Sequence, residues 1–183
     1  MKYDPEKHHR RSIRLKKYNY SSPGHYFVTI CVQNRECILG KIVNGQMVLN
    51  EWGKIVRDCW QWLEKQYPNV ELDEFIIMPN HMHGIIIIND LDCRGDSRNE
   101  TIRRGGVTPP LQNPTLGQIV AYFKYQSTKQ INQLRQTPGT KFWQRNYYEH
   151  IIRNERELYA IRNYIRNNPL KWELDRENPI NWK

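Results

Sequence analysis

The hydrophobic positions of the chain change their period several times, and each change predicts a secondary-structure element. Residues 25–32 are rich in β-branched and aromatic side chains, which is typical of a strand. Residues 38–49 form a second extended stretch that breaks at Asn44-Gly45, a strong hairpin signal. From Asn50, a suitable helix cap, apolar residues follow at helical spacing. This part of the chain therefore predicts a strand, a hairpin and a helix.

The rest of the pattern predicts two more strands, a helix, an extended segment and a last helix. Strands near 71–78 and 82–89 flank a Pro-Asn turn, and the second contains an uninterrupted apolar run, as a strand buried on both faces does. Thr115 is placed to cap the second helix, residues 141–152 favour another strand or extended segment, and Asn154 opens the last helix.

The order of these elements predicts the fold. With the early hairpin and the last helix set aside, the order is β-α-β-β-α-β, the split βαβ or ferredoxin-like arrangement. We therefore expect an α+β sandwich whose central antiparallel sheet has its first and third strands in the middle, plus a C-terminal helix. Residues 1–22 predict a basic N-terminal arm, and residues 23–183 a single domain with a long mobile loop at 90–113.

The charge of the chain favours a nucleic-acid partner. Its 28 Lys and Arg outnumber 19 Asp and Glu, for a net charge of +9, and they are interleaved with 11 Tyr and 6 Trp. Cations meet phosphates and aromatic rings stack on unpaired bases, although an ordinary basic surface remains the alternative. The basic residues that we assign to such a surface are Arg10, Arg11, Arg14, Lys16 and Lys17 of the arm, Lys124 and Lys129 of the second helix, and Arg145.

The sequence also predicts the compartment. The N-terminus has no apolar segment typical of a secretory signal, and no long apolar segment favours a membrane partner. The four cysteines show neither a Cys-x-x-Cys pair nor zinc-ribbon spacing, so we expect reduced thiols. We expect a cytoplasmic protein, associated with the nucleoid if its partner is DNA.

Two histidines, His81 and His83, lie one residue apart at the start of a predicted strand. Alternate side chains of a strand share a face, so both imidazoles point the same way and can hold one metal ion. The alternative is a buried histidine pair bonded only to backbone and to neighbouring strands. Gly84 follows directly, and its missing side chain would let a DNA backbone approach closely.

The last predicted helix contains a second pair of candidates, Tyr164 and Asn168. Residues four apart share a helix face, so one rigid element would present both side chains. A tyrosine can attack a phosphodiester, and an asparagine carbonyl can complete a metal site with two imidazoles. The alternative is that Tyr164 is an amphipathic residue at the edge of the apolar stripe.

Four segments of the chain together resemble the single-tyrosine HUH-endonuclease transposases, and among them the repeat-associated tyrosine transposases. The HUH motif is two histidines separated by a bulky apolar residue, as in His81-Met82-His83. The segments similar to the opening strand, the metal motif, a box of the repeat-associated branch and the tyrosine helix are residues 23–30, 78–85, 143–154 and 164–171.

The resemblance implies a role for each candidate residue. His81 and His83 would be metal ligands, Asn168 the third ligand and Tyr164 the nucleophile, with Mg²⁺ or Mn²⁺ as the ion. Asn167 is a possible substitute ligand. The resemblance further implies that Tyr147 and Tyr148 are packing or base-stacking residues rather than nucleophiles.

The implied activity is metal-dependent nicking and strand transfer of single-stranded DNA at hairpin-forming repeats, through a 5′-phosphotyrosine intermediate. One alternative is a non-catalytic protein that binds DNA hairpins and derives from such a transposase. A phosphoesterase of small nucleotides and an RNA hairpin substrate are further alternatives. The protein would be a monomer, or a homodimer that exchanges the tyrosine helix between subunits.

Overall fold

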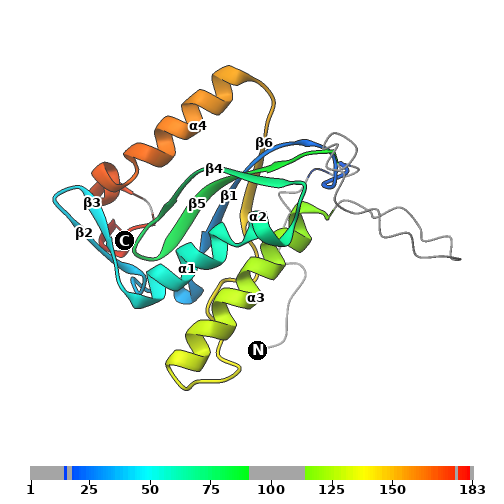
Figure 1. Cartoon of the computed structure of the whole chain (residues 1–183). Helices are drawn as coiled ribbons and strands as arrows, with labels where there is room; N and C mark the ends of the chain where they lie inside the picture. The colour runs from blue at the N-terminus through cyan, green and yellow to red at the C-terminus, as the bar shows by residue number, and fades with distance from the viewer. Residues whose placement is uncertain (1–14, 16–17, 91–113, 176, 182–183) are drawn as a thin grey trace, which may run out of the picture.

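A four-stranded antiparallel sheet forms the centre of the molecule (Figure 1). The structure, a computed structural model, describes residues 15, 18–90, 114–175 and 177–181. The strand order β4-β5-β1-β6 places the first and third strands of this sheet in the middle, so the ferredoxin-like prediction is confirmed. The strands are β1 (Gly24–Cys31), β4 (Val70–Ile77), β5 (His81–Ile88) and β6 (Tyr148–Ile152), and a separate hairpin is formed by β2 (Gly40–Val43) and β3 (Gln46–Leu49).

Helices lie on both faces of the sheet, with α1 and α3 on one face and α4 on the other (Figure 1). The predicted caps are confirmed, since Asn50, Thr115 and Asn154 each accept a hydrogen bond from a backbone N–H of the first helical turn. The helices are α1 (Glu51–Gln61), α2 (Leu63–Gln66), α3 (Leu116–Leu134) and α4 (Glu155–Asn167), with 3-10 helices η1 (Gln33–Arg35), η3 (Pro169–Leu174) and η4 (Pro179–Asn181).

The alternation of side chains along β5 divides the interior into two cores. Met82 and Ile86 point into the larger core beneath α1 and α3. Ile85 points the other way, into a small core in which Leu158 and Ile165 of α4 pack. His81 and His83 share the face of Ile85, because residues at odd positions of this strand lie on one side. The two histidines therefore lie on the α4 face of the sheet.

Of the strand or extended segment expected at 141–152, only Tyr148–Ile152 forms a strand. Phe142 and Trp143 are neighbours in the chain, and both are buried in the larger core. A regular strand sends successive side chains to opposite faces, so it cannot bury both in one core. Trp143 makes an isolated bridge to Val32 instead.

No disulfide joins Cys31, Cys37 and Cys59, and the fourth cysteine, Cys93, lies outside the described residues. Burial, with a smaller contribution from Asp58, raises the pKa of the Cys59 thiol to about 11. Within the described part of the chain, no helix is long and apolar enough to cross a membrane. The predictions for Arg10, Arg11, Arg14, Lys16, Lys17 and, apart from Asp90, the loop at 90–113 lie outside the described residues.

The expectation that Gly84 admits a DNA backbone was wrong. Gly84 faces the larger core, opposite to the histidines, and a Cβ atom there would lie 2.5 Å from Cζ2 of Trp60. Trp60 is fully buried and packs edge-on against Phe123 of α3. The glycine therefore makes room for an indole ring inside the protein rather than for a ligand.

We predict that Gly84→Ala lowers the free energy of unfolding by about 1–3 kcal/mol, because the added methyl overpacks the core against Trp60. Urea denaturation followed by circular dichroism measures the change. In a Trp60→Phe background the smaller ring leaves space, so the same substitution should cost less. An equal cost in both backgrounds would contradict this explanation.

Candidate metal and tyrosine site

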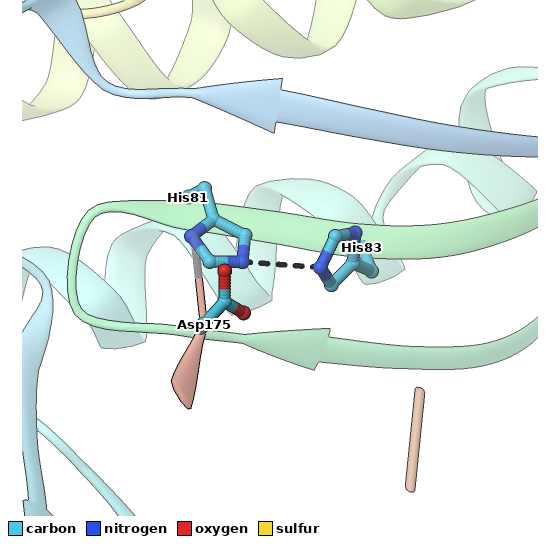
Figure 2. Close-up of side chains that lie close together, drawn as sticks. All are labelled: His81, His83 and Asp175. Atoms are coloured by element: carbon cyan, nitrogen blue, oxygen red, sulfur yellow. Dashed lines mark hydrogen bonds between the residues drawn. The ribbon is translucent and has the colours of Figure 1, made fainter. Parts of the chain in front are cut away.

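His81 and His83 form a buried pair at the start of β5, and the two residues are 0% and 3% exposed. Nε2 of one ring lies 3.1 Å from Nε2 of the other (Figure 2). The neighbouring strand β1 pairs Cys31 with His81 and Thr29 with His83, so the pair is held in the middle of the sheet. A rigid platform thus brings the two ring nitrogens together.

Asn80 fixes the tautomer of His81. The Asn80 amide nitrogen donates to the backbone carbonyls of Arg35 and Glu177, which only accept, so its Oδ1 atom faces His81. Nδ1 of His81 lies 2.8 Å from that oxygen and must therefore carry the proton. In the neutral ring the lone pair is then on Nε2, the atom directed at His83.

Thr29 supports the second ring, because its hydroxyl lies 2.8 Å from Nδ1 of His83. A hydroxyl both donates and accepts, so Thr29 is compatible with either neutral tautomer of His83. When His83 presents a lone pair at Nε2, its Nδ1–H donates to Thr29. The two histidines can therefore offer two converging lone pairs, an arrangement that a cation stabilises.

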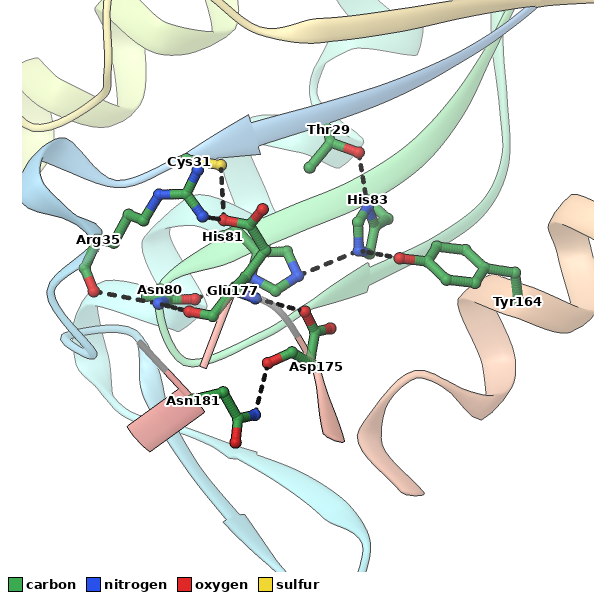
Figure 3. A network of polar contacts seen from close by, with 10 residues as sticks. All are labelled: Thr29, Cys31, Arg35, Asn80, His81, His83, Tyr164, Asp175, Glu177 and Asn181. Carbon is green, nitrogen blue, oxygen red and sulfur yellow. Dashed lines mark hydrogen bonds and ion pairs between the residues drawn. The ribbon is translucent and has the colours of Figure 1, made fainter. Parts of the chain in front are cut away.

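Tyr164 reaches this pair from α4. Its hydroxyl lies 3.2 Å from Nε2 of His83 (Figure 3). The ring packs edge-on against Phe27, with centroids 6.1 Å apart, and Phe27 in turn stacks on His83 at 5.5 Å. Tyr164 as a whole is 47% exposed, and its hydroxyl contacts a buried imidazole.

Two ion pairs hold α4 on the sheet on either side of Tyr164. Arg162 bonds Asp73 at 2.8 Å, and Arg166 bonds Glu74. Asp73 and Glu74 are consecutive in β4, where a regular strand would point them to opposite faces. The register of β4 against β5 shifts between residues 72 and 75, and both carboxylates bond to α4 at this irregularity.

The start of α4 is tied to β6 through Glu157. Its carboxylate accepts from the Arg153 backbone N–H at 2.7 Å and lies 2.6 Å from Nε2 of His150. These hydrogen bonds, the backbone one first, lower the pKa of Glu157. The lowered pKa means that this contribution to stability is present above the ordinary carboxyl pKa and is lost as the pH falls through the folded value.

Two residues with a side-chain oxygen, Asn168 and Asp175, are candidates for the third ligand. Asn168, at the C-terminal cap of α4, is 3% exposed, and its Oδ1 atom is buried with no hydrogen-bond partner among the described residues. Asp175 offers a carboxylate whose ligand atom lies within 4.8 Å of those of both histidines (Figure 2). Asn167, the possible substitute ligand, is exposed, and its side-chain nitrogen donates to the Asn163 carbonyl of its own helix.

The geometry fits a divalent ion. Two nitrogens about 2.1 Å from one ion lie about 3.0 Å apart at octahedral angles and about 3.4 Å apart at tetrahedral angles. The observed 3.1 Å separation between His81 Nε2 and His83 Nε2 falls in this range. Asn168 Oδ1 is buried without a partner among the described residues, and an unbonded buried amide oxygen is costly.

The C-terminal tail closes the other side of the site, a contact that the sequence analysis missed. The Glu177 carbonyl accepts from Asn80, and the Glu177 carboxylate pairs with Arg35 (Figure 3). The Trp172 ring lies 6.1 Å from that of His81. Asp175 enters the site through this fold-back, which leaves no periodic signal in the sequence.

The predicted nucleic-acid residues divide into two groups. Lys124 is half-buried, its ammonium group donates to backbone carbonyls of Gln144 and Asn146, and it lies over the Tyr147 ring, so it holds the segment before β6 in place. Lys129, Arg145 and Tyr148 are exposed. Tyr148 is also close to the site, since its ring packs edge-on against Phe27 at 6.2 Å.

Comparison with known proteins gives relatives of two kinds, although no family model matches the chain. A Haemophilus influenzae protein of uncharacterised function is 46% identical over 175 residues, which cover 95% of this chain and 96% of that protein. A candidate REP-associated tyrosine transposase of the same organism is 26% identical over 161 residues, or 84% of this chain and 74% of that protein.

A solved structure of a REP-associated tyrosine transposase bound to a REP hairpin has the same fold. Its TM-score is 0.56 at 20% sequence identity, and the match covers 87% of this chain and 74% of that one. The 46% identity across nearly the whole of both chains shows that this protein and the first Haemophilus influenzae protein belong to one family.

We predict that Asn80→Ala lowers the affinity for Mn²⁺ by about 10–100-fold, because His81 loses the acceptor that fixes its tautomer. Isothermal titration calorimetry measures the affinity. Asn69→Ala is the matched control, since Asn69 is also buried and bonds a backbone carbonyl, but at the far end of β4. A loss of the same size in both variants would contradict the role given to Asn80.

Proposed function

The chain is a relative of the REP-associated tyrosine transposases, and on that premise we propose that it nicks and rejoins single-stranded DNA at hairpin-forming repeats. The observation that supports this most strongly is the contact between Tyr164 and the histidine pair. A half-exposed tyrosine whose hydroxyl lies 3.2 Å from a buried imidazole nitrogen supports the proposal that it attacks a ligand held by the same site.

The proposed site has metal ligands and a positioning residue. His81, His83 and Asn168 hold a divalent ion, which when bound supplies Lewis-acid polarisation of the scissile phosphate. Phe27 packs against both His83 and Tyr164 and so keeps the tyrosine ring beside the pair. Two imidazoles and an oxygen do not select Mg²⁺ by ligand type, so we propose Mg²⁺ or Mn²⁺, with Mn²⁺ bound more tightly.

The proposed reaction exchanges one phosphate ester for another. The Tyr164 oxygen attacks the phosphorus, the bond to the 3′ oxygen breaks, and the phenol proton passes through solvent to that oxygen. A tyrosine ester with the 5′ phosphate and a free 3′-OH result. The new ester keeps the energy of the phosphodiester, so a 3′-OH can attack it and rejoin the strand without a nucleotide cofactor.

One chain contains every group of the proposed site. Arg162 and Arg166 dock α4 on β4 of the same chain, and this places Tyr164 beside His83 without a second subunit. We therefore propose a monomer as the active unit, acting at the nucleoid. In a homodimer with exchanged tyrosine helices the same two ion pairs would form between subunits, so the mass of the protein in solution distinguishes the two assemblies.

We predict a covalent protein–DNA adduct that depends on the metal and on Tyr164. The wild type is mixed with a single-stranded oligonucleotide that contains a hairpin from beside its own gene, with Mn²⁺ or Mg²⁺, and run on a denaturing gel. A shifted band should appear only with the metal, should vanish in Tyr164→Phe, and should persist in Tyr148→Phe, a neighbouring exposed tyrosine.

A band that survives in Tyr164→Phe would refute the assignment of the nucleophile. If no band forms although the hairpin binds, the protein is a hairpin-binding relative that does not cut.

We also predict that Asn168→Ala weakens Mn²⁺ binding by at least about tenfold, because the third ligand is lost, whereas Asn168→Asp retains binding through an oxygen in the same place. Asn167→Ala is the control, since that neighbour is exposed. Isothermal titration calorimetry measures the Mn²⁺ affinity of each variant. A larger loss in Asp175→Asn than in Asn168→Ala would make the Asp175 carboxylate the third ligand.

A further inference from the structure

Nε2 of His83 is the atom at which the histidine pair and the tyrosine meet (Figure 3). It lies 3.1 Å from Nε2 of His81 and 3.2 Å from the Tyr164 hydroxyl. A nitrogen of a neutral imidazole either carries one proton or offers one lone pair. Nε2 of His83 therefore cannot bind a metal ion and also keep a hydrogen bond to either neighbour.

Without an ion, the fixed tautomer of His81 determines where the proton of His83 lies. Because Nδ1 of His81 donates to Asn80, Nε2 of the neutral His81 ring can only accept. Two lone pairs that face each other across 3.1 Å repel, whereas an Nε2–H of His83 makes an ordinary hydrogen bond to His81 at that distance. The favoured neutral tautomer of His83 then carries its proton on Nε2, and its Nδ1 accepts from the Thr29 hydroxyl at 2.8 Å.

Metal binding requires the opposite tautomer of His83. A ligand nitrogen offers its lone pair, so the proton must lie on Nδ1 when Nε2 is the ligand. One proton leaves Nε2 for solvent and another from solvent reaches Nδ1, so the ring stays neutral. Thr29 then accepts from Nδ1–H instead of donating to Nδ1. A hydroxyl does either by rotating its hydrogen, and no heavy atom has to move.

Thr29 and Asn80 therefore treat the two rings differently. Asn80 presents an oxygen that only accepts, so it holds His81 in one tautomer. Thr29 presents a hydroxyl, which leaves His83 free to exchange its proton between the two nitrogens. Thr29 lies in the interior strand β1, paired with His83 on one side and with Tyr148 of β6 on the other, so its backbone is held in place.

The exchange at His83 changes the contact of Tyr164. The Tyr164 oxygen can accept from an Nε2–H, or its hydroxyl can donate to an Nε2 lone pair, but an Nε2 atom bound to a cation permits neither bond. The hydroxyl is then available to the scissile phosphate. The tyrosine ring keeps its edge-on contact with Phe27, so it stays beside the pair.

We propose that Thr29 is a positioning residue that lets His83 change tautomer, and that this change couples metal binding to release of the Tyr164 hydroxyl. The inference rests on the metal site of the proposed function, because it describes how that site becomes ready to bind. Its direct consequence is that the Tyr164 hydroxyl and the ion compete for one nitrogen, Nε2 of His83.

Nuclear magnetic resonance of wild-type protein with ¹⁵N-labelled histidine locates the ring protons. Zn²⁺ is the probe, because it is diamagnetic and binds two imidazoles and an oxygen tightly. We expect His83 to carry its proton on Nε2 without the ion and on Nδ1 with saturating Zn²⁺, while His81 keeps its proton on Nδ1 throughout. The inference is overturned if His83 carries its proton on Nδ1 in both conditions, or on both nitrogens without the ion.

The competition is measured by isothermal titration calorimetry with Mn²⁺. Tyr164→Phe removes the competing hydroxyl, so it should bind Mn²⁺ about 2–10-fold more tightly than the wild type, the net value of one hydrogen bond. Tyr159→Phe is the matched control, since Tyr159 is an exposed tyrosine of the same helix, and its affinity should be unchanged. Weaker binding by Tyr164→Phe would make the hydroxyl a ligand and overturn the competition.

Two substitutions test the hydroxyl of Thr29. Thr29→Val keeps the shape of a β-branched residue suited to a strand, but leaves Nδ1–H of His83 without its acceptor, so the affinity for Mn²⁺ should fall by about 10–100-fold. Thr29→Ser restores the hydroxyl and should bind within about twofold of the wild type. Wild-type affinity in the Val variant, or equal losses in both variants, would refute the role of Thr29.

Failure of this inference is distinct from failure of the proposed function. If the covalent adduct forms but His83 keeps one tautomer, only the exchange is refuted. If His83 changes tautomer and Tyr164→Phe binds Mn²⁺ more tightly, but no adduct forms, the exchange holds and only the cleavage is refuted. The resonance experiment uses the wild type, so its outcome does not depend on the folding of any variant.

Discussion

The docking of α4 on the sheet is the interaction on which the proposed site depends. Tyr164 and Asn168 are useful only if their helix lies over His81 and His83, and the small core of Phe27, Ile85, Ile152, Leu158 and Ile165 provides only part of that contact. Two arginines of α4 complete it by pairing with consecutive carboxylates of β4. The irregularity in β4 is what allows both carboxylates to bond to α4, so a local departure from strand geometry positions the tyrosine.

The histidine pair is held in position by groups that bond Nδ1 of each ring, which leaves the Nε2 atoms to face the proposed metal. Asn80 holds His81 in one tautomer, and Thr29 supports His83 from β1. Asn80 is in turn fixed by carbonyls from η1 and from the C-terminal tail. The tail therefore reaches the His81 ring through one asparagine, and residues far apart in the sequence set the orientation of that ring.

Much of the fold and part of the site could be predicted because the signals are local. Strand alternation placed His81 and His83 on one face, helix periodicity placed Tyr164 and Asn168 on another element, and the cap residues marked where helices begin. The contact of Tyr164 with His83 follows once β5 is central and α4 covers its free face. Family resemblance, rather than spacing, was needed to prefer these readings over ordinary packing.

The missed features depend on tertiary contacts. Gly84 was assigned to a ligand because its neighbours are histidines, but strand alternation turns it toward Trp60. The stretch at 141–147 has strand composition, yet two adjacent buried aromatics exclude a regular strand. Asp175 belongs to the C-terminal tail, which Asn80 and Arg35 hold through Glu177. No local sequence pattern predicts these tertiary contacts.

Anomalous diffraction from crystals soaked in Mn²⁺ would test the proposed metal site most directly. A single manganese peak bonded to Nε2 of both His81 and His83, with the Tyr164 hydroxyl beside it, is the predicted result. Manganese bound elsewhere, or no peak at a saturating concentration, would contradict the site and leave the histidines as a hydrogen-bonded pair.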